Sequence, residues 1–125
     1  MPLTNTGRDA ICKALINDTP TFFNNANAYI GVGDSTTVFD VTQTDLQAVT
    51  NKTRKAMEAT YPQRVGNQIT FKGSFGTTDA NYTWNEWGIF NASTGGEMLC
   101  RLVENKGSKN GGTWVITATI TINIA

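Results

Sequence analysis

The stretch TWVITATITINIA, residues 113–125, has the strongest secondary-structure pattern in the sequence. Apolar residues alternate with polar ones, mostly threonine, which is the period of a β-strand with one buried face. The residues predicted on the buried face are Trp114, Ile116, Ala118, Ile120, Ile122 and Ile124. A strand of this kind is an exposed, sticky edge unless something covers it, and a partner subunit is one way to cover it.

Weaker strand patterns precede this stretch, separated by turn residues such as Gly, Asn and Asp. The predicted strands cover residues 28–33, 53–61, 69–75, 82–90 and 98–103. Residues 36–51 are polar and predict an irregular loop. Residues 105–112 contain Gly, Asn and Lys, and we expect a mobile loop there in which Lys106 and Lys109 are solvated.

One helix is predicted near the N-terminus, over about residues 5–17. Thr6 followed by Asp9 resembles a capping box, and Pro20 disfavours a helix beyond this point. The apolar positions at helical spacing are Ala10, Ile11, Ala14 and Leu15. The prediction is therefore a mainly β protein: a small antiparallel β-sandwich with one N-terminal amphipathic helix, in a single domain over residues 1–125 with strands across about 28–125.

The amino-acid composition argues against several classes of function. Of 125 residues, 39% are apolar, which is enough for one small core, and 20 Thr, 13 Asn and 12 Gly favour strands and turns. Ten basic and ten acidic residues cancel, which argues against a basic nucleic-acid-binding face. Histidine is absent, which removes Ser-His-Asp catalysis and His-ligated metals. We expect no enzyme activity, no cofactor, and neither a nucleic acid nor a membrane as partner.

The two cysteines, Cys12 and Cys100, are too few for a zinc site or a disulfide framework. They can pair with each other only if they meet in space. The simpler interpretation is that both are small buried core residues.

A series of short motifs resembles small structural proteins of tailed bacteriophages. The resemblance is to the N-terminal module of phage tail-collar fibre proteins, and to short stand-alone virion proteins with the same Leu-Thr-Asn-x-Gly start. It covers roughly residues 3–103. The motifs, in order, are Leu3-Thr4-Asn5-Thr6-Gly7, Gly31-Val32-Gly33-Asp34, Thr44-Asp45-Leu46, Arg54, Trp84-Asn85-Glu86-Trp87-Gly88-Ile89-Phe90-Asn91, Gly95-Gly96 and Met98-Leu99.

This resemblance implies a non-enzymatic, oligomeric virion component that is made in the host cytoplasm. Tail-collar proteins continue into a fibre shaft, whereas this sequence stops at residue 125, so we expect a capsid decoration (cement) protein that bridges neighbouring subunits. The alternatives are a tail, baseplate or collar component and a small glycan-binding module. The expected partners are further copies of the chain, as a trimer, and major capsid or tail proteins.

Six residues are candidates for the interface: Leu3, Trp84, Trp87, Ile120, Ile122 and Ile124. Trp84 and Trp87 have opposite parity on a strand, so we expect one in the core and the other open to a subunit or a sugar ring.

Glu86 lies within an apolar strand, on the face predicted for Trp84, and a buried carboxylate needs a partner. Arg54 and Arg101 are the candidates for a structural ion pair with it. Glycosidase-type catalysis by Glu86 would need a second carboxylate nearby, and the sequence offers no obvious one. The aspartates at 34, 40 and 45 lack the spacing of a calcium loop.

Overall fold

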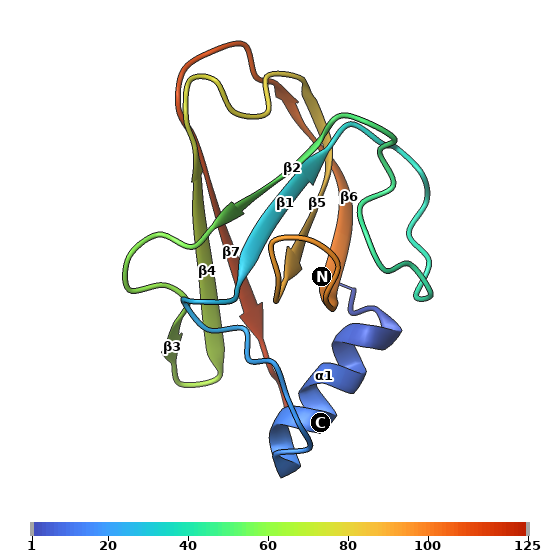
Figure 1. Cartoon of the computed structure of the whole chain (residues 1–125), viewed down its shortest axis with the longest axis vertical. Helices are drawn as coiled ribbons and strands as arrows, with labels where there is room; N and C mark the ends of the chain where they lie inside the picture. The colour runs from blue at the N-terminus through green and yellow to red at the C-terminus, as the bar shows by residue number, and fades with distance from the viewer. Residues whose placement is uncertain (1, 125) are drawn as a thin grey trace.

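A computed structural model describes residues 2–124, which form two antiparallel sheets and one helix (Figure 1). The first sheet has the order β2-β1-β5-β6, with bounds β1 Tyr29–Gly33, β2 Lys52–Ala56, β5 Thr83–Phe90 and β6 Met98–Ser108. The second has the order β3-β4-β7, with bounds β3 Gln63–Val65, β4 Gln68–Phe75 and β7 Trp114–Thr121. The helix α1 spans Asn5–Ile16. The predicted fold class, a small antiparallel β-sandwich with one helix, is confirmed.

The strand predicted from the alternation over residues 113–125 is β7, and it pairs antiparallel with β4 along its whole length. Its alternation is visible in the burial of Ile116 and Ala118 and the exposure of Thr117 between them. The pairing continues one residue past the strand, since the backbone N–H of Ile122 donates to the carbonyl of Asn67 at 2.9 Å. Beyond Ala118 the side chains on the apolar face of β7 become more exposed. Within residues 2–124, no segment covers this face at the end of the strand, although its apolar residues predicted such a cover.

The two sheets do not match in width. Four strands face three: β4 contacts β1 and β2, and Trp114 of β7 lies edge-on to Trp84 of β5 with 5.0 Å between ring centroids. Within residues 2–124 there is no strand beyond β7, and thus none in the second sheet to lie opposite β6. The sandwich is therefore open on this side, where α1 contacts β6.

The helix begins at residue 5, as predicted, but its N-cap differs from the one that the capping-box pattern indicated. Thr4, not Thr6, is the N-cap, and its hydroxyl oxygen accepts a hydrogen bond of 2.9 Å from the N–H of Gly7. Asn17 ends the helix in the left-handed conformation, at φ 56°. Gly7 and Ala10 are buried, so Ala10 is the one residue of the predicted apolar stripe that packs inward, while Ile11, Ala14 and Leu15 are exposed.

Glycine explains how α1 docks. A Cβ atom added to Gly7 would lie 2.1 Å from the carbonyl oxygen of Leu99, so only glycine permits this approach to β6. The helix contacts β6 near its start and continues past the lower end of the sheets (Figure 1). Ile11 and Leu15 consequently remain 44% and 84% exposed.

Two strand predictions were wrong in length. β2 ends at Ala56 rather than residue 61, because Ala56 pairs with Tyr29, the first residue of β1, and the N–H of Glu58 already donates to the carbonyl of Lys72 in β4 at 2.8 Å. β6 continues to Ser108, where a loop was expected. Lys109, predicted to be solvated, is 2% exposed because its ammonium donates to the carbonyl of Gly76 at 2.6 Å and to the side-chain oxygen of Asn81 at 2.9 Å. No helix among the described residues is long and apolar enough to cross a membrane.

Candidate functional site

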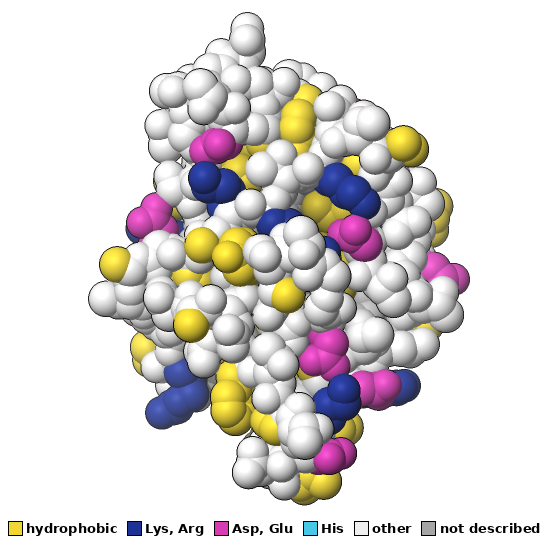
Figure 2. All heavy atoms as spheres, viewed as in Figure 1, with side chains coloured by type: hydrophobic (Ala, Val, Ile, Leu, Met, Phe, Trp, Pro, Cys, Tyr) yellow, Lys and Arg dark blue, Asp and Glu magenta, His cyan; other side chains and the backbone are white. Residues whose placement is uncertain are grey.

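The open side of the sandwich is an apolar groove of about 610 Å³, hereafter the α1–β7 groove. One wall is α1 with Leu3, the opposite wall is formed by β4 and β7 with Ile122, and residues 21–24 complete it. Every residue that lines the groove is apolar or an uncharged Thr or Asn. In Figure 2 hydrophobic side chains reach the surface at the lower end of the molecule, where α1 lies. An exposed apolar surface of this kind is typical of an interaction site.

The groove brings together three of the six predicted interface residues. Leu3, Ile120 and Ile122 all line it, although more than a hundred residues separate Leu3 from the other two. Ile122 is 57% exposed, and Ile124, which shares its parity, is 98% exposed. Leu3 and the end of β7, which lie at opposite ends of the sequence, thus contribute to one continuous surface.

The Leu-Thr-Asn-x-Gly motif builds the helical wall of this groove. Leu3 forms an isolated antiparallel bridge with Cys100, and the backbone N–H of Thr4 donates to the carbonyl of Leu99 at 3.2 Å. The Thr4 hydroxyl also donates to the carbonyl of Met98. The motif therefore fastens the start of α1 to β6, and this attachment fixes the position of Leu3 at the groove.

The third wall is fastened by Asn91, the last residue of the Gly-Ile-Phe-Asn motif. Its amide nitrogen donates to the carbonyl of Thr21 at 3.0 Å, and its oxygen accepts from the N–H of Glu97 at 2.8 Å. Sequence reasoning missed Ile11 and Phe22 as groove residues. The pair of phenylalanines just after Pro20, in an otherwise polar stretch, was the signal that could have indicated this wall.

The expectation that one tryptophan is open to the surface was wrong. Trp84 is 1% and Trp87 5% exposed, and both belong to the same core cluster. The pairing of β5 with β6 shifts register between Trp84 and Glu86, which breaks the alternation that the parity argument assumed. Trp84 donates from Nε1 to the carbonyl of Ala80 at 2.9 Å. Neither ring is available to stack on a sugar, so the glycan-binding alternative loses its basis.

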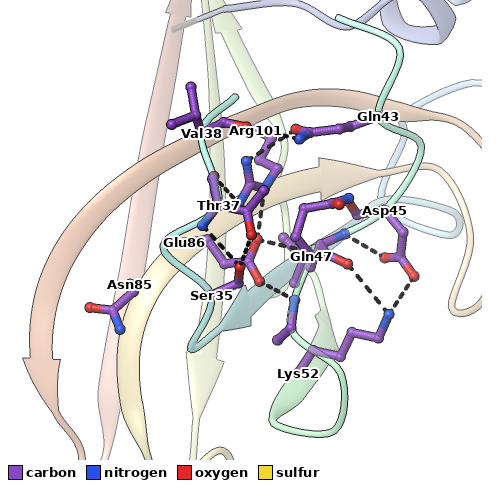
Figure 3. A network of polar contacts seen from close by, with 12 residues as sticks. Ser35, Thr37, Val38, Gln43, Asp45, Gln47, Lys52, Asn85, Glu86 and Arg101 are labelled. Atoms are coloured by element: carbon purple, nitrogen blue, oxygen red, sulfur yellow. Dashed lines mark hydrogen bonds and ion pairs between the residues drawn. The ribbon is translucent and has the colours of Figure 1, made fainter. Parts of the chain in front are cut away.

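Glu86 and Arg101 form an ion pair with both side chains 0% exposed (Figure 3). Arg101 Nε lies 2.7 Å from Glu86 Oε2. The same carboxylate accepts the backbone N–H groups of Gln47 at 2.9 Å and Ala48 at 2.8 Å. The guanidinium and the two N–H groups together compensate the negative charge of the buried carboxylate, so it needs no contact with water.

The arginine of this pair is saturated as well. Its terminal nitrogens donate to the side-chain oxygen of Gln43 at 3.0 Å and to the carbonyl of Thr37 at 2.9 Å. The pair thereby holds residues 37–48 against the outer face of β5 and β6 (Figure 3). Because the charges are buried and their hydrogen bonds are internal, this arrangement is a structural clamp rather than an acid–base site.

Arg54, the other candidate partner, does not reach Glu86. Its guanidinium lies 3.1 Å from Asp45, donates to the carbonyl of Ala92 at 2.9 Å and covers the ring of Phe90 at 3.5 Å from the centroid. Burial alone would raise the pKa of Asp45, but hydrogen bonds from Lys52 and Arg54 outweigh it, and the pKa is lowered. Arg54 therefore ties the residues around Asp45 to the turn after β5.

The cysteines do not form a disulfide. Cys100 is buried in β6 as expected, and burial raises the pKa of its thiol to about 12. Cys12 is exposed on α1, so its predicted place in the core was wrong. The two thiols differ in access to solvent, a difference that makes selective labelling feasible.

Among residues 2–124, no three Cys, Asp or Glu side chains gather as a metal site. No protein-family model matches the chain, and a search of curated proteins finds no match either.

Proposed function

We propose that this chain is a non-enzymatic structural protein of a tailed-phage virion, specifically a capsid decoration protein that bridges neighbouring subunits. The observation that carries the proposal is the α1–β7 groove, an uncharged apolar surface built from segments far apart in the sequence. Such a surface favours binding to another protein. It offers no convergent polar groups that would orient a reacting substrate.

The motifs that resemble phage virion proteins support this function through their structural tasks. Leu3, Thr4 and Gly7 fasten α1 to β6, and Asn91 fastens residues 21–24. All of them shape the groove, and none presents an exposed nucleophile or acid–base group. Motifs with these structural tasks fit a protein that binds other proteins and performs no chemistry.

A decoration protein strengthens a shell by contacting more than one subunit, so that internal pressure must break its contacts as well. A specific contact of this kind buries about 800 Å² on each partner. The neutral net charge and the Thr- and Asn-rich surface suit contacts that salt weakens little, because screening acts on exposed charges. The groove would supply the apolar contact between copies of the chain, and the polar Thr- and Asn-rich surface around it would face the capsid subunits.

Gold-labelled antibody imaging of purified particles of the phage that encodes the chain tests this function. We expect label scattered over the head shell. Label confined to the tail or collar would overturn the decoration role and favour the tail component that the resemblance also implies. If particles carry no label, mass spectrometry of denatured particles separates a covered epitope from absence. Absence of the chain from the particle would contradict the virion assignment itself.

A further inference from the structure

We propose that residues 120–124 of a second copy of this chain fill the α1–β7 groove by pairing antiparallel with the open edge of β7. The inference deepens the proposed function, since it rests on the groove being the binding surface and names its occupant. The arrangement is reciprocal, because each copy supplies the same segment to the other. It therefore has twofold symmetry and predicts a dimer, in place of the trimer expected from the sequence.

The groove has the position of an absent strand. The second sheet has three strands against four in the first, and β7 is its last strand on the side where β6 and α1 lie. Ile120 of β7 and Ile122 just beyond its end line the groove, and Leu99 lines it from β6. A strand placed beside β7 would continue the second sheet over β6 and the start of α1, and would cover the apolar residues that the sandwich leaves open.

The backbone at this end of β7 is ready for such a partner. The N–H of Ile122 points to β4, because it donates to the carbonyl of Asn67. In an antiparallel ladder the neighbouring residues direct their N–H and C=O groups to the opposite side. Thr121 and Asn123 therefore present their backbone groups at the open edge, where a second strand can accept and donate hydrogen bonds.

The side chains specify a register. If residue 122 faces residue 122 of the second copy, Thr121 pairs with Asn123 of the copy through the outward backbone groups, and Ile120 faces Ile124. Directly opposite residues point to the same face of a sheet, so Ile122 and Ile124 of the copy enter the groove beside Leu3 and Ile11. This register covers Ile124, which is 98% exposed in the single chain.

Charge does not oppose this pairing. The groove has no charged lining residue, and residues 113–124 contain none either. Proteins usually protect open edge strands with lysine, proline or a bulge. β7 has none of these: Thr117 and Thr119 occupy the outer face, and its pairing with β4 is regular from end to end. An unprotected edge beside an apolar groove is the feature expected of a strand that is covered by its own copy.

A disulfide cross-link tests the register. In the Cys12→Ala background, Ile122→Cys should form a reducible dimer on mild oxidation, since facing residues in a non-hydrogen-bonded antiparallel pair have Cβ atoms about 4.5–5.5 Å apart. Cys100 is buried and does not compete. The matched control is Val65→Cys in the same background, because Val65 is 77% exposed on β3, away from the groove. Equal cross-linking of the two variants would overturn the register.

Sedimentation of the purified full chain tests the dimer itself. Ile122→Asp should raise the dimer dissociation constant at least about tenfold, because a carboxylate would be buried in an apolar contact. Leu15→Asp, on an exposed part of α1 that does not line the groove, should leave it unchanged. A wild-type chain that stays monomeric at high concentration, or forms a trimer, would contradict the proposal. Both tests use the isolated chain. A negative result would therefore overturn the dimer alone, whereas an absence of label on particles would count against the proposed function.

Discussion

Replacing Glu86 by glutamine is expected to destabilise the protein by about 3–5 kcal/mol, the range found when one partner of a buried ion pair is removed. Arg101 would keep its charge at 0% exposure, with Gln43 and the carbonyl of Thr37 as its remaining acceptors. The amide of glutamine also offers one acceptor oxygen where the carboxylate has two. Urea unfolding, with the midpoint and slope measured together, gives the change in the free energy of unfolding.

The control for this substitution is Glu104→Gln. Glu104 pairs with Lys106 at 2.9 Å, but both side chains are well exposed, at 45% and 37%. Exposed pairs of this kind contribute roughly 0–1 kcal/mol. Equal effects of the two substitutions would show that residues 37–48 do not depend on the buried pair. A selective loss at Glu86, with faster proteolysis within residues 37–48, is the result that the clamp predicts.

Gly7→Ala is expected to destabilise the protein by about 1–3 kcal/mol or more, the cost of overpacking a rigid contact. The added methyl would lie 2.1 Å from the carbonyl oxygen of Leu99, and backbone cannot yield as a flexible side chain does. In an unhindered helical position the same change is favourable by about 1 kcal/mol. A destabilisation measured by thermal or urea unfolding therefore reports the docking of α1 on β6.

Cys12→Ala is the matched control, because it introduces the same residue at an exposed position of the same helix. We expect its stability to equal or slightly exceed that of the wild type. If Gly7→Ala were as stable as Cys12→Ala, α1 would not be held against Leu99 in solution. The helical wall of the α1–β7 groove would then lack the support described above.

The second half of the fold could be predicted from the sequence because its patterns are local. Alternation over residues 113–124 indicated β7 and its buried face without any knowledge of the partner strand. The alternating run over residues 69–75 indicated β4 for the same reason. These elements depend on the period of neighbouring residues, which a sequence displays directly.

The environment of β5 depends on segments distant in sequence, and sequence reasoning failed there. Trp87 is buried in the same core as Trp84 because the β5–β6 register shifts between Trp84 and Glu86. On the other face, Leu46 packs against Phe90. Glu86 was correctly recognised as needing an arginine, but choosing Arg101 over Arg54 required the strand pairing. Parity alone cannot reveal an irregularity in a ladder.

The α1–β7 groove was predicted only in part. Leu3, Ile120 and Ile122 were chosen as separate contact residues, and the structure places them on one surface. The sequence could not show this, because the surface exists only where β7 ends beside the docked helix. The direction of α1 depends on the close approach at Gly7, a contact with residues more than ninety positions away. The amphipathic stripe suggested instead that Ile11 and Leu15 would be buried.

Amide hydrogen exchange of the wild-type chain, resolved by residue and measured at low and high protein concentration, is the decisive test of pairing at the open edge of β7. Exchange at Thr121 and Asn123 should slow as concentration rises, because their N–H groups face this edge and would donate to the second copy. Thr117 directs its N–H to the same edge outside the proposed overlap, so its exchange should not change with concentration. Exchange at Thr121 and Asn123 that is as fast as at Thr117 at every concentration would contradict the proposed strand pairing between two copies.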